Sequence, residues 1–330
     1  MTLIRIRKAV SVIVLIGFFF LFAGPESVSV ILSGILPPLQ FTPALIRSLF
    51  EPNPIFISGL ILIVAVTLVF GRVYCSFLCP LGTLQDLFGA WARRLHLQKD
   101  PSYTRPYNLL RYSILAGTAF AWSIGFLSFV NLLDPFAQTG KLFSNIVQPL
   151  LVQAYNLCIT ALKPFDIYFY PRQAAPVIGS SLALTVGFFS LIAFMSMKRG
   201  RLYCNTLCPV GTLLGLLSRI SLFKWVVNPK GCSECVRCEK ACKAQCIDGQ
   251  AMSVDMSRCV GCFNCLDVCN KTAIRYGRTS APAASPRWSP ARRSFVLGGI
   301  AAAGGLLWGI NPLLRQTPGT ARAETKPPVT

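Results

Sequence analysis

GRVYCSFLCPLGTL at residues 71–84 and GRLYCNTLCPVGTL at residues 200–213 decide how this chain is organised. The two stretches agree at ten of fourteen positions, although their starts lie 129 residues apart. Each follows a long apolar run, and each contains one Cys-x3-Cys-Pro unit. We call residues 71–84 the first corner and residues 200–213 the second corner. A unit that is written twice after apolar runs predicts two related half-sites on one face of a membrane.

The composition predicts a membrane protein. Of the 330 residues, 53% are hydrophobic and only 13% are charged, about half the charged share of a typical soluble domain. The runs that we expect to span are about Ile6–Ala23, Ile55–Phe70, Leu109–Val130, Val177–Met197 and Phe295–Ile310. Two interrupted runs, Val28–Leu39 and Ile146–Leu162, are expected to be interfacial or re-entrant at the outer face. We therefore predict an all-α multi-pass bundle of four or five transmembrane helices with an internal repeat.

The basic residues indicate orientation rather than nucleic-acid binding. Lys and Arg number 32 against 12 Asp and Glu, which gives a net charge of +20. Most of them flank apolar runs, and the connectors 71–108 and 198–294 are the basic ones. The positive-inside rule then places the N-terminus and both connectors in the cytoplasm. No nucleic-acid-binding motif accompanies the charge, so no nucleic-acid partner is expected.

Residues 231–277 contain the densest cysteine pattern, and we call them the cysteine module. GCSECVRCEKACKAQC and RCVGCFNCLDVC each contain C-x2-C-x2-C-x3-C. This spacing binds [4Fe–4S] clusters, with the fourth cysteine of each run on the cluster of the other run. The expected ligands are Cys232, Cys235, Cys238 and Cys269 for cluster 1, and Cys242, Cys259, Cys262 and Cys265 for cluster 2.

Other metal chemistry fits the cysteine module less well. Zinc sites use separated Cys-x2-Cys pairs, so a third nearby cysteine would be surplus. Disulfides do not suit a module expected in a reducing cytoplasm. His96 is the only histidine and no CxxCH is present, so no haem is expected. Cys246 is interpreted as a spare or packing residue, and Cys158 has no assigned role.

The cysteine module is expected to be a small α+β domain. Met252–Val254 and Ala273–Tyr276 are expected to form its strands. Apolar residues are expected to shield the cluster sulfurs from water: Val236, Ile247, Val260, Phe263 and Ile274. Lys243 and Asn270 stand where bacterial ferredoxins usually have proline, which affects the backbone near the clusters more than their ligation.

Each corner has two interpretations that the sequence leaves open. The i, i+4 spacing places both thiols on one helix face if the helix continues, while Pro80 and Pro209 would break it. Gly71 and Gly200 would let the backbone turn. Four thiols would then converge on one additional metal centre: Cys75, Cys79, Cys204 and Cys208. In the second interpretation these cysteines are small hydrophobic residues that pack a helix end.

Two corners followed by a two-cluster cysteine pattern resemble the NapH/NosR-type membrane iron–sulfur proteins of bacteria. The resemblance covers about residues 55–277, and CPLGTLQD at Cys79–Asp86 and DPF at Asp134–Phe136 share in it. It implies a protein of the bacterial cytoplasmic membrane, surrounded by lipid. It also implies electron transfer between the quinone pool, or a cytoplasmic donor, and a partner redox protein such as a cytochrome or an iron–sulfur subunit.

A quinol substrate releases protons as well as electrons, so its site needs an apolar cleft and a proton acceptor. Asp86, just after the first corner, and Asp134 or Glu51, expected on the outer side, are the candidates. A capping or solvated role is the alternative for each of them.

A different activity is suggested by proteins of the CcoG cupric-reductase type, which share CxxxCP pairs, membrane spans and a two-cluster module. In that case the four corner thiolates would bind and reduce copper during metallocofactor assembly, since soft ligands suit Cu(I). The large extra-cytoplasmic domain usual in that type is not found in this sequence.

The expected domains are 1–225, the transmembrane part; 226–280, the cytoplasmic ferredoxin part; and 281–330, a linker, a final span and an outer tail. ARRSFVLGGIAAAGGLL at 291–307 reads as a fifth span with a basic flank, or as a twin-arginine-like signal with ARA at 321–323 as a cleavage site.

Overall fold

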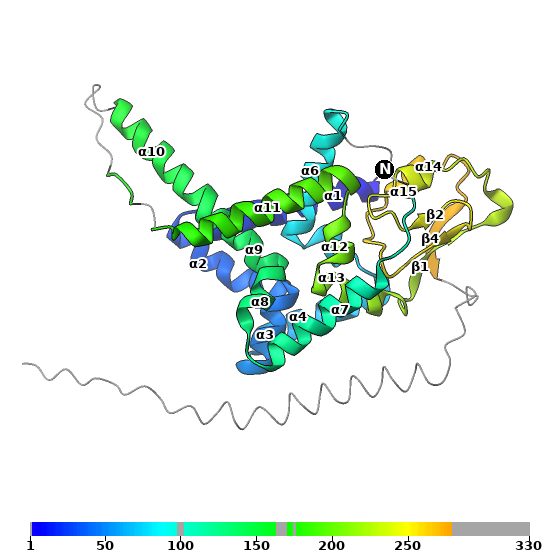
Figure 1. The fold of residues 1–330 in the computed structure, drawn as a ribbon, viewed down its shortest axis with the longest axis horizontal. Helices are drawn as coiled ribbons and strands as arrows, with labels where there is room; N and C mark the ends of the chain where they lie inside the picture. The colour runs from blue at the N-terminus through cyan, green and yellow to red at the C-terminus, as the bar shows by residue number, and fades with distance from the viewer. Residues whose placement is uncertain (1, 98–101, 163–169, 174–175, 279–330) are drawn as a thin grey trace, which may run out of the picture. The chain divides into compact units, whose positions relative to one another are not determined.

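Helices form most of the computed structural model, which describes residues 2–97, 102–162, 170–173 and 176–278 (Figure 1). The expected fifth span and the twin-arginine-like segment lie outside these residues. Before the first corner, the elements are α1 (Thr2–Ala23), α2 (Glu26–Ile35), the 3-10 turn η1 (Pro37–Leu39), α3 (Phe41–Phe50) and α4 (Pro54–Phe70).

The remaining helical elements run from the first corner through the second. Those up to the middle of the chain are α5 (Tyr74–Phe77), α6 (Pro80–Arg94), α7 (Asn108–Ser123) and α8 (Leu127–Leu133). The later ones are α9 (Pro135–Leu142), the π-helical turn η2 (Phe143–Val147), α10 (Gln148–Leu162), α11 (Gly179–Arg199), α12 (Leu202–Thr206) and α13 (Pro209–Ser218). In the packed structure α6 contacts both α1 and α11, and α4 contacts both α3 and α13.

Three described helices are long and apolar enough to cross a membrane: Leu3–Ala23, Pro135–Ala161 and Gly179–Arg199. The first and the last match the predicted runs at Ile6–Ala23 and Val177–Met197. A fourth crossing is available if the pair Glu26–Leu39 and Phe41–Phe50, bent by 88°, acts as a broken span or re-entrant loop. That bend agrees with the expectation for Val28–Leu39, since Pro37 and Pro38 interrupt the helix there.

The predicted run Ile55–Phe70 is found as an apolar helix of 17 residues, α4, one of the shorter apolar helices. Two other expectations about the spans differ from the structure. The run Leu109–Val130 is not one helix, because α7 ends at Ser123, Gly125 adopts a φ of 77° and α8 begins only at Leu127. Ile146–Leu162, expected to be interfacial, instead continues α9 and η2 into a helix of 27 residues. The polar residues of this segment do not end the helix, because the backbone N–H and C=O groups form their hydrogen bonds within the helix whatever the side chains are.

The cysteine module carries two small antiparallel sheets. β1 (Phe223–Val227) pairs with β4 (Ile274–Arg278), with Trp225 opposite Tyr276. β2 (Ile247–Asp248) pairs with β3 (Ser253–Val254). The predicted strands at 252–254 and 273–276 are thus confirmed. The pairing of β1 also shows that the sheet begins at residue 223, before the expected boundary at 226.

Short helices and turns complete the module: η4 (Pro229–Gly231), α14 (Arg237–Lys240) and α15 (Asn264–Val268). The Tyr276 hydroxyl donates to the Phe70 carbonyl over 2.7 Å, and the Leu222 N–H donates to the Leu68 carbonyl over 2.9 Å. Both bonds join the β1–β4 sheet to the C-terminal end of α4. The module is therefore fixed to the helices beside the first corner.

Gly211 is expected to tolerate no side chain. A Cβ there would lie 2.4 Å from the Cys204 carbonyl oxygen and 2.8 Å from Arg72 Nη2. We predict that Gly211→Ala destabilises the protein by about 1–3 kcal/mol, because backbone must move. The thermal unfolding midpoint in detergent measures this. Gly187→Ala in α11 is the control, since nothing lies within 4 Å of its Cβ position. Equal midpoints for the two variants would contradict the close packing described.

Candidate electron-transfer site

The two corners hold each other through a reciprocal pair of arginines. Arg72 Nη2 donates to the Cys204 carbonyl over 3.1 Å, and Arg201 Nη1 donates to the Cys75 carbonyl. Each guanidinium is only 1% exposed. The repeated glycines make room for these contacts, because a Cβ at Gly82 would meet the Cys75 carbonyl and Arg201, as one at Gly211 meets Cys204 and Arg72. The Gly-Arg repeated at 71–72 and 200–201 is the signal in the sequence for these contacts.

Direct contact between the corners limits the membrane topology. Both must lie on the same side, so the chain crosses an even number of times between them. The two long apolar helices between the corners, Pro135–Ala161 and Gly179–Arg199, satisfy that parity. The contact also brings Arg7 near the start of α1 to Asp86 of α6, 2.9 Å apart. The N-terminal end of α1 therefore lies beside the corners.

Neither corner is one continuous helix. The positive φ of Gly71 (74°) and Gly200 (66°) turns the backbone as predicted. A short helix then ends before the proline, and Cys79 and Cys208 become the residues that precede α6 and α13. The Gly211 N–H donates to Cys208 Sγ over 3.3 Å. The two thiols of a corner therefore do not share one helix, because Pro80 and Pro209 each begin a new helix; the predicted break at these prolines is confirmed.

The four corner thiols are buried, each at most 4% exposed: Cys75, Cys79, Cys204 and Cys208. Burial raises the pKa of Cys204 to about 11, although Arg201 opposes this, and it raises the pKa of Cys79 and Cys208 as well. Cys79 and Cys204 lie close enough to influence each other's ionisation. The raised pKa values of Cys79, Cys204 and Cys208 favour the neutral thiols when no cation is bound, and a bound metal would favour their thiolate forms.

Polar groups without partners lie beside these thiols. Among the described residues, the Oε1 atom of Gln85, in α6, and the hydroxyl of Ser76 next to Cys75 have no hydrogen-bond partner, while the Gln85 amide nitrogen faces the Cys204 thiol without a bond of normal geometry. Gln85 lies next to Cys204 and is 1% exposed. Buried polar groups are rarely without a hydrogen-bond partner, so we expect one for each of these groups. Sulfur atoms of a thiolate-bound centre would accept from the Gln85 amide nitrogen and the Ser76 hydroxyl, which is the kind of surrounding contact that such centres have.

Asp86 pairs with three cations from three parts of the chain. Its carboxylate lies 2.8 Å from Arg201 and 3.2 Å from Lys243 in the cysteine module, in addition to the pair with Arg7. Burial opposes ionisation, but the charges of Arg201, Lys243 and Arg7 hold the pKa of Asp86 well below its usual range. In this environment Asp86 is a poor proton acceptor. Its ion pairs instead connect α1, the second corner and the cysteine module.

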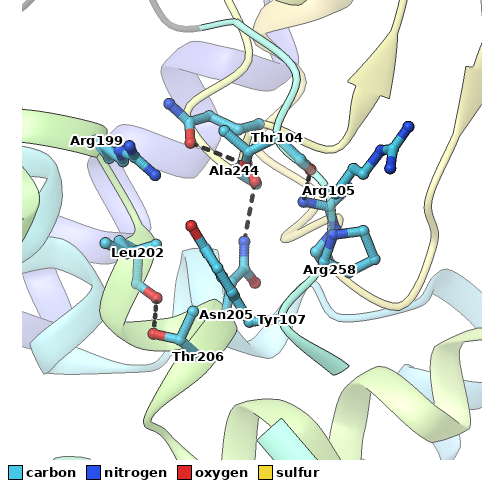
Figure 2. Close-up of a pocket in the computed structure, with 11 residues that line it drawn as sticks. Thr104, Arg105, Tyr107, Arg199, Leu202, Asn205, Thr206, Ala244 and Arg258 are labelled. Atoms are coloured by element: carbon cyan, nitrogen blue, oxygen red, sulfur yellow. Dashed lines mark hydrogen bonds between the residues drawn. The ribbon is translucent and has the colours of Figure 1, made fainter. Parts of the chain in front are cut away.

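The cysteine module joins the corners through the backbone next to its cysteines. The Arg201 N–H donates to the Lys243 carbonyl over 3.0 Å, and Asn205 Nδ2 donates to the Ala244 carbonyl over 3.0 Å. Figure 2 shows the second of these bonds, from Asn205 of the second corner to Ala244, while the Thr206 hydroxyl donates to the Leu202 carbonyl. Lys243 and Ala244 follow Cys242 directly. A cluster 2 ligand loop therefore lies directly on the second corner.

The carbonyl of Ser257, two residues before Cys259, makes a second connection between the cysteine module and the helical part of the chain. It accepts from Arg72 Nη1 over 2.8 Å and from Arg111 Nη2 over 3.0 Å. Burial, with Arg72 nearby, lowers the pKa of Arg111 to about 10. Phe77 of the first corner also packs edge-on against Phe263. Both cysteine runs that contribute to cluster 2 are thus held against the corners.

The structure brings together the four cysteines predicted for cluster 2. One cavity of the module is lined by Cys242, Cys259, Cys262 and Cys265. Apolar residues close it, and three of them, Ile247, Val260 and Phe263, are buried as expected. A fifth cysteine, Cys246, also lines the cavity, with its Sγ 3.5 Å from Cys242 Sγ. Cys246 therefore lies at the cluster 2 site and is not merely the spare or packing residue that the sequence suggested.

The backbone around both cysteine runs has the same unusual shape. Positions in the second run lie 27 residues after those in the first, as Cys259 does after Cys232. Six residues have positive φ at three matched pairs of positions: Glu234 and Gly261, Val236 and Phe263, and Gln245 and Thr272. Non-glycine residues in this region cost energy and often mark function. Such turns direct N–H groups into a concavity that suits phosphate or iron–sulfur groups, so the chain fits the clusters.

Cluster 1 differs from cluster 2 in exposure. Cys235 is exposed, and its three expected partners, Cys232, Cys238 and Cys269, are half-buried. Val236 is 40% exposed, so it is not the buried shield of the cluster sulfurs that the sequence predicted, whereas the matched Phe263 is buried. Within the described ranges, no three His, Cys, Asp or Glu side chains meet closely enough for a single metal ion. A cuboidal cluster instead has its thiolates at separate corners.

Comparison with known proteins bears on these sites. Residues 52–96 and 182–228 both match the model of a 4Fe-4S binding domain family. The ferredoxin-type protein NapH of Escherichia coli is 24% identical over 74% of this chain and 72% of its own length. The regulatory protein NosR of Stutzerimonas stutzeri is 27% identical over 69% of this chain, and YccM of Escherichia coli 26% over 73%.

These similarities support the predicted NapH/NosR-type ferredoxin-domain protein, with iron–sulfur clusters and a role in electron transfer. The match covers 58% of YccM and 28% of NosR, so those relatives extend beyond it. No solved structure matches the chain. The two segments that match the 4Fe-4S family contain the corners and end before the cysteine module.

Asp134 lies elsewhere than expected. It was expected on the outer side, away from the corners, but Tyr203 of the second corner donates to the Leu133 carbonyl over 2.9 Å. The break between α7 and α8 turns the chain back toward the corners and so brings Asp134 there. Its carboxylate accepts from the Ala137 N–H over 2.8 Å and from the Thr42 hydroxyl. Glu51, by contrast, is exposed at the end of α3.

We predict that the Asp86 ion pairs make stability depend on acid. A carboxyl with a lowered pKa stabilises the fold above its unfolded pKa of about 4, and this stabilisation is lost as pH falls below that value. Asp86→Asn should lower stability at pH 7 by about 3–5 kcal/mol and reduce the further loss on acidification. Unfolding midpoints between pH 3 and pH 7 measure both effects. Glu51→Gln is the matched control, and an Asp86→Asn curve parallel to wild type would contradict the assignment.

Cys246 is predicted to influence cluster 2 without ligating it. The Cys246 thiol and nearby backbone N–H groups lower the pKa of Cys242 to about 7, as expected for a donor beside a thiolate. Cys246→Ala should leave the iron content unchanged. It should also lower the potential of one cluster by at most about 40 mV, from ~1 kcal/mol per hydrogen bond and 59 mV per tenfold change. A redox titration followed by electron paramagnetic resonance tests this, and lost iron would make Cys246 a ligand.

Proposed function

We propose that this protein conducts electrons along three thiolate-bound centres, from the membrane side to the exposed end of the cysteine module or in reverse. Two are [4Fe–4S] clusters with the ligand sets given above, and the third is held by Cys75, Cys79, Cys204 and Cys208. The observation that carries this proposal is that Lys243, Ala244 and Ser257, beside the cluster 2 cysteines, bond directly to the corners. Short, protein-filled gaps between centres are what stepwise electron transfer requires.

The charges around the corners support the third centre. Arg72 and Arg111 are each 1% exposed, and within the described part of the chain neither has a carboxylate ion-pair partner. Asp86 is one carboxylate among three cations. A buried charge without a counter-charge is costly. Four thiolates on a metal centre would supply negative charge beside these guanidiniums, and Arg72 Nη2 already lies 3.9 Å from Cys75 Sγ.

The exposed and buried ends of this pathway suit different partners. Cluster 1 has an exposed cysteine, Cys235, where a soluble or peripheral redox protein would exchange electrons. The corners lie against helices that are apolar enough for a membrane, where the quinone pool would be the partner. Together with the basic connectors, this supports a bacterial inner-membrane location with the N-terminus and cysteine module in the cytoplasm.

Iron analysis tests the third centre. Two [4Fe–4S] clusters supply about eight irons per chain, and a third would raise the total to about twelve. We predict the higher value for the wild type and about eight for Cys75→Ser/Cys204→Ser, with acid-labile sulfide falling in parallel. Cys158→Ser is the matched control, because Cys158 is exposed on α10.

Two outcomes would contradict that prediction. A wild-type content of about eight irons that the double variant does not change would remove the third iron centre. Copper that binds tightly to the wild type and not to the double variant would favour the cupric-reductase alternative, in which the corner thiolates hold Cu(I).

A further inference from the structure

A cavity of about 290 Å³ lies beside the second corner. This is about twenty times the volume that one water needs by the same measure. Its walls come from α3, α7, α8 and α13, and they are almost wholly apolar, with Phe41, Leu45, Leu115 and Trp122 among them. A cavity with this lining favours an uncharged, apolar molecule over a charged one, because a charge there would lose its solvation.

One end of the cavity carries a polar pair, Asp134 and Thr42. The Asp134 carboxylate is 3% exposed, and its two oxygens accept from the Thr42 hydroxyl and the Ala137 N–H. A carboxylate has further acceptor positions beyond these two bonds. Asp134 can therefore accept a hydrogen bond from a hydroxyl of a molecule in the cavity.

The same cavity lies next to the second corner. Pro209 and Val210 line it and follow Cys208 directly, so part of its wall is the first turn of α13. Tyr203 connects the second corner to the residue before Asp134, since its hydroxyl donates to the Leu133 carbonyl over 2.9 Å. A proton acceptor and an electron acceptor thus flank one apolar cavity.

We propose that this cavity binds the ring of a lipid-soluble quinol, with Asp134 as the group that accepts its protons. This rests on the proposed electron-transfer function and names the site of its membrane partner. Oxidation of one quinol breaks two O–H bonds. The two electrons leave one at a time to the thiolate-bound centres. Asp134 takes one proton, releases it to water and then takes the second, leaving the quinone.

The surroundings of Asp134 agree with this role. Burial raises the pKa of Asp134, while the bonds from Thr42 and Ala137 and the charge of Lys141 oppose the rise. Its other titratable neighbours are Tyr74 and Tyr203, one from each corner. A proton acceptor works best when its pKa lies near the operating pH. The raised pKa of Asp134 therefore suits this role, and the lowered pKa of Asp86 does not.

The test follows reduction of the iron–sulfur absorbance by decylubiquinol in the purified full-length protein. Asp134→Asn keeps the size of the side chain but cannot accept a proton, so we expect the reduction rate to fall about 100-fold or more, with the loss of its pH dependence. Ala119→Phe fills the cavity and should raise the half-saturating quinol concentration at least about tenfold. Ala116→Phe is its control, because Ala116 is exposed on the same helix and does not line the cavity.

Dithionite separates the possible failures. Every variant should reduce fully with dithionite, which shows that the centres are assembled. If quinol reduces the wild type and all three variants equally, the cavity assignment is wrong while the proposed function stands. If dithionite reduces the wild type and quinol does not at any pH, both the quinol link and the cavity assignment are overturned.

Discussion

The whole arrangement depends on two buried guanidiniums that cross between the corners. Arg72 and Arg201 each bind the carbonyl of a cysteine in the opposite corner, although the corners lie 129 residues apart. A buried guanidinium has five donors to satisfy, and few groups can approach it unless glycine leaves space. Gly82 and Gly211 leave that space. The repeated Gly-Arg, Cys, Pro and Gly of the sequence are therefore parts of one interlocking contact.

The same arginines determine where the cysteine module lies. Arg72 has donors left for the Ser257 carbonyl and Asn205, and Arg201 is paired with Asp86, which also holds Lys243 of the module. The positive charge of this region exceeds its carboxylate charge. It thereby favours thiolates and added electrons, since opposite charges stabilise each other strongly at low dielectric. Structure and redox chemistry thus depend on one set of side chains.

Structural features that depend on neighbouring residues were predicted from the sequence. The turns at Gly71 and Gly200, the strands near 253 and 274, and the buried Ile247, Val260 and Phe263 follow from residue type and spacing. The cysteine spacing also anticipated which four thiols line one cavity of the module.

Contacts between distant segments could not be read from the sequence in the same way. Asp86 looked like a possible proton acceptor until Arg7 and Lys243 were found beside it, and Asp134 looked distant until the break after α7 returned it to the second corner. A single Gly at position 125 inside an apolar run was a weak signal for that break. The long helix Pro135–Ala161 was missed because its polar residues mask its hydropathy.

The central claim is that the paired corners enclose a metal centre in line with the two clusters of the cysteine module. An anomalous difference map collected at the iron absorption edge measures this most directly. We expect three peaks, two within residues 231–277 and one between Cys75, Cys79, Cys204 and Cys208. Peaks confined to the module, with clear density for four unligated thiols between the corners, would contradict it.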